Sequence, residues 1–316
     1  MKHKVIIDCD PGHDDAAALV LATRAAQIDL LGVTVVAGNS TLENTVRNAL
    51  NVLAFAGAGD VPVYAGCEKP LERELANTSG AQIHGADGLG DQKFEQETRE
   101  AEQEHAVDYL VRTLRGAKEK ITLVCLGPLT NIASAFRKAS ECRENVERLI
   151  IMGGAVRVPG NVTRAAEFNF YIDPEAAKIV LGSGCEIYLN PLDITMKALF
   201  YREDIEALRG RENKLSRFVG GLLALYAGNY TKELGFYACP VHDAVCVGVL
   251  MEPALVRYEK THMEVETDGP DAGRSAPDRA EGRPVWYGSE IDRAGFVRLV
   301  EETVLKPRAR QAGKPQ

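Results

Sequence analysis

Short apolar runs alternate along the chain with longer stretches in which apolar residues recur at helical spacing. The short, β-branched runs predict strands, and the longer stretches predict amphipathic helices. Strands are expected at residues 5–7, 30–36, 121–126 and 149–152, and helices at 14–26, 42–56, near Thr130 and from Asp173. Because this alternation is typical of parallel sheets, we expect an α/β fold with a mostly parallel, open, Rossmann-like sheet and helices on both faces.

The pattern changes after residue 200. Helices are expected at 202–208, 215–229, 241–250 and 292–305, and strand-like pieces at 255–258 and 262–266. Residues 267–284 (TDGPDAGRSAPDRAEGRP) are rich in glycine, proline and charge, which predicts an exposed connection. No internal repeat is present. We therefore expect a single domain over residues 1–305 with helical additions toward its carboxyl end, and a basic, disordered tail over residues 306–316.

The composition, with 45% hydrophobic and 26% charged residues, is that of a soluble globular protein. The net charge of -8 argues against binding of nucleic acid or an anionic membrane, since both require a basic surface. Seven cysteines occur without a CxxC pair and are expected to be reduced core residues. The amino end, MKHKVIIDCD, lacks a signal-peptide core, and no apolar run reaches membrane-spanning length, so a cytoplasmic location is expected.

Four of the expected strands end in turn-forming residues. These endings read DCDPG, VVAGN, CLGPLTN and MGGA. In open α/β sheets the ligand crevice lies outside the carboxyl ends of the strands. We therefore expect the four endings to converge at one site.

The first ending opens an acidic turn, in which Asp8, Asp10, Asp14 and Asp15 lie within eight positions. Capping of the next helix would explain one or two of these acids, but not four. The DxD spacing also matches haloacid-dehalogenase-like phosphatases, although a Pro-Gly pair replaces the small hydroxyl residue expected after it. A hard cation such as Ca²⁺ would neutralise the cluster, and the Pro-Gly turn can fold Asp10 back toward Asp14 and Asp15.

Eight blocks of sequence, in order, resemble the nucleoside hydrolases (nucleoside N-ribohydrolases). They read DCDPGHDDAAAL, VAGNSTLENTVRNA, AGCEKPL, IHGADGLGD, LGPLTNIA, MGGA, GNVTRAAEFNFYIDPEAA and PVHDA, and cover most of residues 4–250. The resemblance implies an enzyme that hydrolyses the N-glycosidic bond of ribonucleosides to free base and ribose, with bound Ca²⁺ and a water nucleophile. It also implies a homo-oligomer, either a dimer or a tetramer.

The resemblance also implies roles for individual residues. Calcium would be bound by Asp10, Asp15, the backbone carbonyl of Leu126, and Asp243, with Asp10 also accepting a proton from the water. The ribose hydroxyls would be bound by Asp14, Asn39, Asn161, Glu167 and Asn169. We expect Glu167 and Asn169 to face one side of an extended segment, because they are two residues apart. Asp173, by contrast, is expected to cap a helix that has Pro174 at its first position.

The base would be contacted by a further group of residues. His242 and His84 are the candidate proton donors, and His84 lies in a glycine-rich loop suited to closing over a ligand. Tyr230 would contact the base, and Phe168 would stack against the ligand. Purine-specific relatives stack the base on tryptophan, but the single tryptophan, Trp286, lies outside the matching blocks. We therefore expect a broad or pyrimidine-leaning preference.

Two alternatives remain open from the sequence. One is a calcium-dependent protein that binds ribose or a nucleoside without catalysis, and the other is the phosphatase. Asp10 discriminates the first alternative from an enzyme, because binding alone does not require a proton acceptor.

Overall fold

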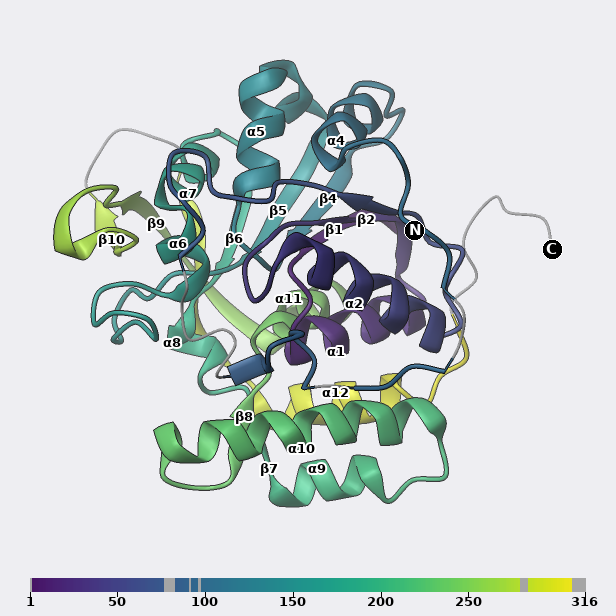
Figure 1. Ribbon diagram of the computed structural model, residues 1–316. Helices are drawn as coiled ribbons and strands as arrows, with labels where there is room; N and C mark the ends of the chain where they lie inside the picture. The colour runs from purple at the N-terminus through teal and green to yellow at the C-terminus, as the bar shows by residue number, and fades with distance from the viewer. Residues whose placement is uncertain (1, 77–82, 91, 96–97, 279–283, 309–316) are drawn as a thin grey trace.

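The computed structural model describes residues 2–76, 83–90, 92–95, 98–278 and 284–308. Within them, one nine-stranded sheet has the order β10-β9-β11-β6-β5-β4-β1-β2-β3 (Figure 1). Its strands are β1 (His3–Cys9), β2 (Ile28–Val35), β3 (Val63–Ala65), β4 (Ile121–Cys125), β5 (Val146–Met152), β6 (Ile187–Asn190), β9 (Val256–Val265), β10 (Ser275–Asp278) and β11 (Val285–Ile291). All neighbours from β11 to β3 pair in parallel, and only β9, which pairs with β11 and β10, runs antiparallel to its neighbours. The predicted mostly parallel sheet is confirmed.

Helices cover both faces of this sheet, as predicted. One face carries α1 (His13–Arg24), α2 (Leu42–Phe55) and α11 (His242–Met251), and the other carries α4 (Ala106–Arg115), α5 (Thr130–Lys138) and α7 (Pro174–Leu181) (Figure 1). Successive side chains of a strand point to opposite faces, so Val5 and Ile7 of β1 join the core under α1, whereas Ile6 joins the core under α5. The central strands are therefore apolar on both sides.

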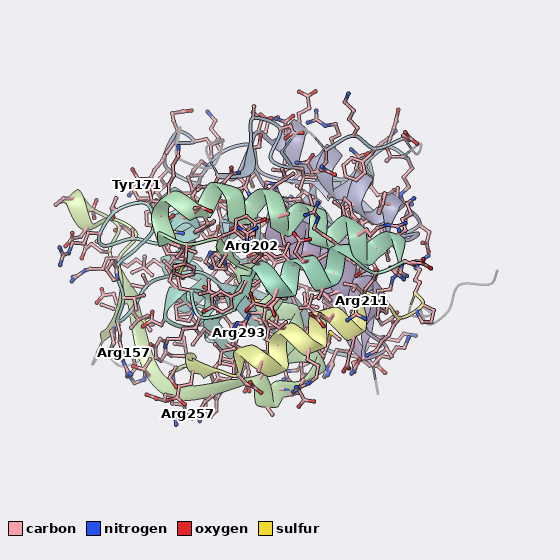
Figure 2. The ribbon with its side chains drawn as sticks, turned by 90° about the horizontal axis from the view of Figure 1, so that it is seen from below. Arg157, Tyr171, Arg202, Arg211, Arg257 and Arg293 are labelled. Carbon is pink, nitrogen blue, oxygen red and sulfur yellow. The ribbon has the colours of Figure 1, made fainter. Side chains whose placement is uncertain are left out.

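The helical additions form a further layer outside α1 and α11. This layer contains α9 (Arg202–Arg209), α10 (Lys214–Leu234) and α12 (Arg293–Thr303). Figure 2 shows the layer from below, with Arg293 between α12 and the other two helices. The Arg293 guanidinium donates to the carbonyl oxygen of Leu199 over 2.7 Å and pairs with Asp204 of α9. The short strands β7 (Leu199–Tyr201) and β8 (Ala238–Pro240) form a separate antiparallel pair.

Some elements differ from the expectation. The sequence patterns did not indicate α4, β3, β6 or β11, nor the short helices α6 (Phe168–Ile172) and α8 (Leu192–Thr195). The two strand-like pieces after residue 254 are one continuous strand, β9. β9 is continuous because β11 pairs with its residues 256–261 and β10 pairs with its residues 262–265.

The stretch 267–284 is not the simple exposed connection that was expected. It contains β10, which pairs with β9, and the side chain of Ser275 is buried. Ser275 Oγ accepts a hydrogen bond from the amide of Ala155 over 3.0 Å and donates to its carbonyl over 3.1 Å. The prediction was wrong because β10 is an edge strand, whose backbone hydrogen-bond partners come from its one neighbour, β9. A proline such as Pro277 is tolerated in an edge strand. Residues 279–283 of this stretch lie outside the described residues.

The expectations from composition have separate outcomes. All seven cysteines are free thiols, and six of them are buried. Among the described helices, none combines the length and apolar character that a membrane crossing requires. Residues 309–316 of the predicted disordered tail lie outside the described part of the chain, while Arg308 pairs with Asp60 at 2.5 Å.

Candidate active site

The predicted convergence of strand endings is confirmed by hydrogen bonds between them. The amide of Asn39, after β2, donates to Asp10 Oδ2, after β1, over 2.7 Å. Asn169 Nδ2 donates to the carbonyl oxygens of Leu126, after β4, at 2.7 Å and Met152, at the end of β5, at 3.2 Å. These contacts link β1 with β2 and β4 with β5, and β1 is itself paired with β4, so the carboxyl ends of four adjacent strands meet at one site.

The acidic turn is folded by its own backbone amides. α1 begins directly after Gly12, and Asp15 in its first turn accepts from the amides of Gly12 (2.9 Å) and Asp10 (3.3 Å). A carboxylate in the first helical turn also interacts favourably with the positive end of the helix dipole. The sequence predicts that this turn folds Asp10 back toward Asp14 and Asp15, and the contact with Asp15 is confirmed.

An acidic cluster forms where α1 and α11 begin. It consists of Asp14, Asp15 and Asp243, whose ligand atoms lie within 4.8 Å of one another. All three residues are buried. Asp14, expected at the ribose, thus lies in the group best placed to hold a metal ion. Asp10 lies next to this cluster, since its negative charge, after burial and the charges of Asp14 and Asp15, also raises the pKa of Asp243.

Burial dominates the electrostatics of these four carboxyl groups. It raises the pKa of Asp10, Asp14, Asp15 and Asp243, and repulsion from neighbouring carboxylates raises three of them further, Asp14 to about 8. None of the ion pairs formed by the described Lys and Arg residues includes any of the four. A crowded, all-oxygen set without a cationic side chain fits a hard divalent cation.

A pocket of about 230 Å³ opens above the acidic cluster. The predicted site residues that line it are Asp14, Asn39, His84, Leu126, Asn161, Glu167, Phe168, Asn169, Tyr230, His242 and Asp243. Asp10 and Asp15 are not in its lining, and their carboxylates accept from the backbone amides of Asn39 and of the turn, respectively. The structure thus brings the predicted residues together around a space suited to one small molecule.

One wall of the pocket is made by the segment that precedes α7. Glu167 does not lie in an extended segment, as was expected, but caps α6. Its carboxylate accepts from the amides of Gly154 (2.8 Å) and Asn169 (2.9 Å). Burial raises the pKa of Glu167 to about 7, although these amides oppose the shift. Asn161 Oδ1 accepts from the amide of Phe168 over 2.9 Å, so this wall is a preformed set of polar groups.

The opposite wall carries two buried histidines. His242 Nδ1 lies 2.8 Å from Thr195 Oγ1, and His242 Nε2 lies 3.3 Å from the Tyr230 hydroxyl. Burial lowers the pKa of His242 to about 3 and that of His84 well below its ordinary value. Both imidazoles are therefore neutral at pH 7, and each can donate one hydrogen bond and accept one.

The family model described as inosine-uridine preferring nucleoside hydrolase matches residues 5–298. The chain belongs to this family. The pyrimidine-specific ribonucleoside hydrolase RihB of Escherichia coli is 39% identical over 308 residues, which are 96% of this chain and 97% of that protein. This membership confirms the resemblance seen in the sequence and the prediction of an N-glycosyl hydrolase.

Solved structures support the same assignment. A plant nucleoside hydrolase, PpNRh1, superposes with a TM-score of 0.92 at 32% identity, over 96% of this chain and 99% of that one. A purine-preferring ribonucleoside hydrolase from Gardnerella vaginalis gives a TM-score of 0.90 at 30% identity, over 95% and 98% of the two chains. Nothing in these relationships supports the phosphatase alternative.

The sequence analysis missed five residues that line this nucleoside hydrolase pocket, namely Ile83, Met152, Val162, Tyr226 and Glu233. It also missed His13, which does not line the pocket but stacks on His84. Tyr226 precedes Tyr230 by four residues and therefore shares its face of α10, which is a signal that helical spacing could have supplied. No comparable signal marks His13, since its partner is 71 residues away.

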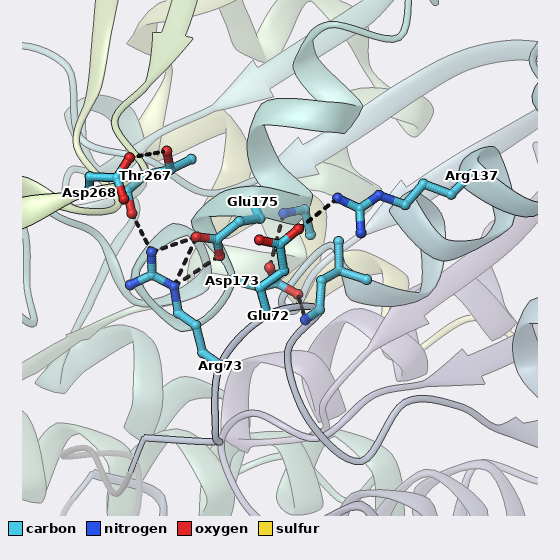
Figure 3. A network of polar contacts seen from close by, with 9 residues as sticks. Glu72, Arg73, Arg137, Asp173, Glu175, Thr267 and Asp268 are labelled. Carbon is cyan, nitrogen blue, oxygen red and sulfur yellow. Dashed lines mark hydrogen bonds and ion pairs between the residues drawn. The ribbon is translucent and has the colours of Figure 1, made fainter.

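A network of charged residues holds the chain between β3 and the glycine-rich loop (Figure 3). Arg73 pairs with Glu175 of α7 and also donates to the carbonyl of Thr267. Asp173 caps α7, as predicted, and accepts from the amide of Leu71 over 2.9 Å. The start of α7 thereby anchors the segment that leads toward His84, and Asp173 has a structural role.

Proposed function

We propose that this protein hydrolyses the N-glycosidic bond of ribonucleosides, with a preference that is broad or leans toward pyrimidines. The observation that carries the proposal is the division of the pocket, with carboxylates at one end and neutral hydrogen-bonding rings at the other. Breaking a glycosidic bond creates positive charge on the sugar and negative charge on the leaving base. The two ends of the pocket complement these two charges.

The acidic end fits a divalent cation, and kinship favours Ca²⁺ held by Asp10, Asp15, the carbonyl of Leu126, and Asp243. When bound, such an ion would lower the pKa of a water molecule beside it. Asp10 would take the proton from the water that attacks ribose C1′. In the cation-free protein, burial and the charge of Asp15 raise the pKa of Asp10. A bound cation would lower it again and keep the carboxylate ionised, so that it could accept the proton.

The polar walls would orient the sugar. Asp14, Asn39, Asn161, Glu167 and Asn169 all line the pocket and are the proposed ligands of the ribose hydroxyls. Glu167 and Asn161 are already fixed by backbone amides, so little side-chain entropy would be lost when ribose binds. Such preorganisation would hold the sugar in the orientation needed for attack on C1′ and so lower the entropic part of the barrier.

The neutral end would assist the leaving base. His242 is held between Thr195 and Tyr230, and His84 faces the same space from the glycine-rich loop. A neutral imidazole N–H can donate to a base atom as negative charge builds there. Phe168 would stack against the ligand. The pyrimidine preference is supported by the similarity to RihB and by the position of Trp286, which stacks on Tyr188 rather than lining the pocket.

Substitution of Asp10 tests the proposal. Wild-type protein with millimolar Ca²⁺ should release ribose from uridine and cytidine, measured as reducing sugar, with inosine and adenosine as comparison substrates. Asp10→Asn keeps the side-chain shape but removes the proton acceptor, so kcat should fall by about 100-fold or more. Asp271→Asn, at an exposed position, is the matched control.

Other outcomes would replace the proposal. If calorimetry shows that the wild-type protein binds uridine while no ribose is released, the protein is a non-catalytic nucleoside binder. Phosphate release from an aryl phosphate would instead support the phosphatase.

Kinship also leads us to propose a homo-oligomer, either a dimer or a tetramer. We further propose the cytoplasmic location that was expected from the sequence. Light scattering coupled to gel filtration would measure the number of subunits. Fractionation of the producing cells would test the location.

A further inference from the structure

His13, the first residue of α1, has no role in the proposed reaction, yet it contacts a residue that does. Its side chain is fully buried and stacks on Tyr226, with 5.4 Å between ring centroids and 11° between ring planes. Two nitrogen atoms of His13 meet one atom of His84. The backbone nitrogen lies 3.2 Å, and Nδ1 lies 3.1 Å, from His84 Nδ1.

These two contacts determine where the protons lie. A backbone amide can only donate, so His84 Nδ1 accepts and carries no proton. The Nδ1 atom of His13 must then be a donor, because two facing lone pairs at 3.1 Å would repel each other. A neutral imidazole carries one N–H. The proton of His84 is therefore on Nε2, and the proton of His13 is on Nδ1.

The same contacts orient the ring of His84. Its Nδ1 edge faces the start of α1, so the Nε2–H bond lies on the other edge of a ring that lines the pocket. Among the described residues, no hydrogen bond occupies His84 Nε2. A Cβ atom added to Gly12 would lie 2.6 Å from His84 Nδ1, so glycine at this position permits the close approach.

We propose that His13 is a positioning residue that sets the tautomer of His84, so that His84 presents an N–H donor to the departing base. The inference rests on the proposed function. In the opposite tautomer, His84 would present a lone pair to base atoms that gain negative charge as the glycosidic bond breaks. That arrangement would repel the leaving group instead of stabilising it.

A matched pair of variants isolates the donor. His13→Asn and His13→Leu both remove the ring and its stacking on Tyr226. Asn keeps an N–H group on the nitrogen attached to Cγ, as His does, whereas Leu has none. Nitrogen-15 NMR of histidine-labelled protein reports the tautomer of His84 without any need for turnover, and His84→Gln assigns its signal. We expect the Nε2–H tautomer in the wild type and in His13→Asn, where two donors face His84 Nδ1. In His13→Leu only the backbone amide of residue 13 still donates to His84 Nδ1, so the fraction of the Nδ1–H tautomer should rise.

Kinetics separate positioning from a merely structural role. Uridine needs help for its leaving base, whereas 4-nitrophenyl β-D-ribofuranoside releases a phenolate that needs no proton. His13→Leu should lower kcat for uridine by about tenfold or more with little change in KM, and should change turnover of the aryl riboside by less than about threefold. His13→Asn should recover most of the loss with uridine.

Two results would overturn the inference. One is an Nδ1–H tautomer of His84 in the wild type, and the other is an equal loss with both substrates in His13→Leu. If the wild type hydrolyses neither uridine nor another nucleoside, the proposed function fails. The NMR measurement would then still test the assignment of the His84 tautomer, because it does not depend on turnover.

Discussion

At the scale of single residues, Gly12 shapes both ends of the pocket. Its amide donates to Asp15 at the acidic end, and its missing Cβ leaves room for His84. Its backbone is extended, with φ of -98°, so an alanine would meet no conformational strain there. Any effect of a substitution must therefore come from the new methyl group.

Gly12→Ala should displace His84 and lower kcat for uridine by about tenfold, because the donor to the base moves away. Folding stability should change by only about 1 kcal/mol, since a side chain at a pocket can shift. Gly221→Ala, in α10 where a Cβ meets nothing within 4 Å, is the control and should leave turnover intact. Steady-state kinetics and thermal unfolding measure both effects. Unchanged turnover by Gly12→Ala would show that His84 tolerates the displacement.

At the scale of elements, α2 fastens the glycine-rich loop over the pocket. Asn48 Nδ2 donates to the carbonyl of Asp87 in the loop over 2.7 Å and to the carbonyl of Pro11 in the acidic turn over 3.1 Å. From the other side, Asn229 of α10 donates to the carbonyl of Ile83 over 2.7 Å. Side-chain amides thus hold the loop between two helices.

Asn48→Ala should leave two carbonyl groups without their donor and destabilise the protein by about 1–3 kcal/mol. Because the loop carries His84, KM for uridine should also rise severalfold. Asn145→Ala removes a similar bond, to the carbonyl of Leu114 over 2.9 Å, far from the pocket. That control should lose stability without a change in KM. A KM that rises equally in both variants would mean that the loop does not depend on α2.

The elements differ in how clearly the sequence marks them. α1 and α2 were predicted to within about two residues, because helical periodicity and N-terminal capping are local signals. β3 and β6 are too short to give a pattern, with three and four residues. β10 has a composition typical of a loop and is a strand only because β9 supplies its hydrogen-bond partners.

At the scale of the whole molecule, the buried carboxylates make folding sensitive to pH and to cations. In cation-free protein the pKa of Asp14 is raised to about 8, above its value in the unfolded chain. Between about pH 4 and pH 8 the native state therefore holds more protons than the unfolded state, and stability falls as pH rises. A divalent cation would neutralise the carboxylates and remove this fall.

Thermal unfolding between pH 5 and pH 8 checks this expectation. In chelator the Tm should decrease with rising pH, while millimolar Ca²⁺ should raise the Tm most at pH 8. Asp14→Asn should flatten the decrease in chelator, whereas the exposed Asp271→Asn should not alter it. A Tm at pH 8 that does not change when Ca²⁺ is added would argue against a cation at the acidic cluster.

The sequence by itself determined the alternation of strands and helices, the convergence of their endings, and eleven of the residues that line the pocket. These features are encoded in local periodicity, in turn chemistry and in motifs of known order, so they can be seen without coordinates. Only the tertiary structure decided that Asp14 lies in one cluster with Asp243, and that His13 meets His84. Those contacts join segments far apart in the chain, and their distances depend on how helices pack against the sheet, which no local pattern records.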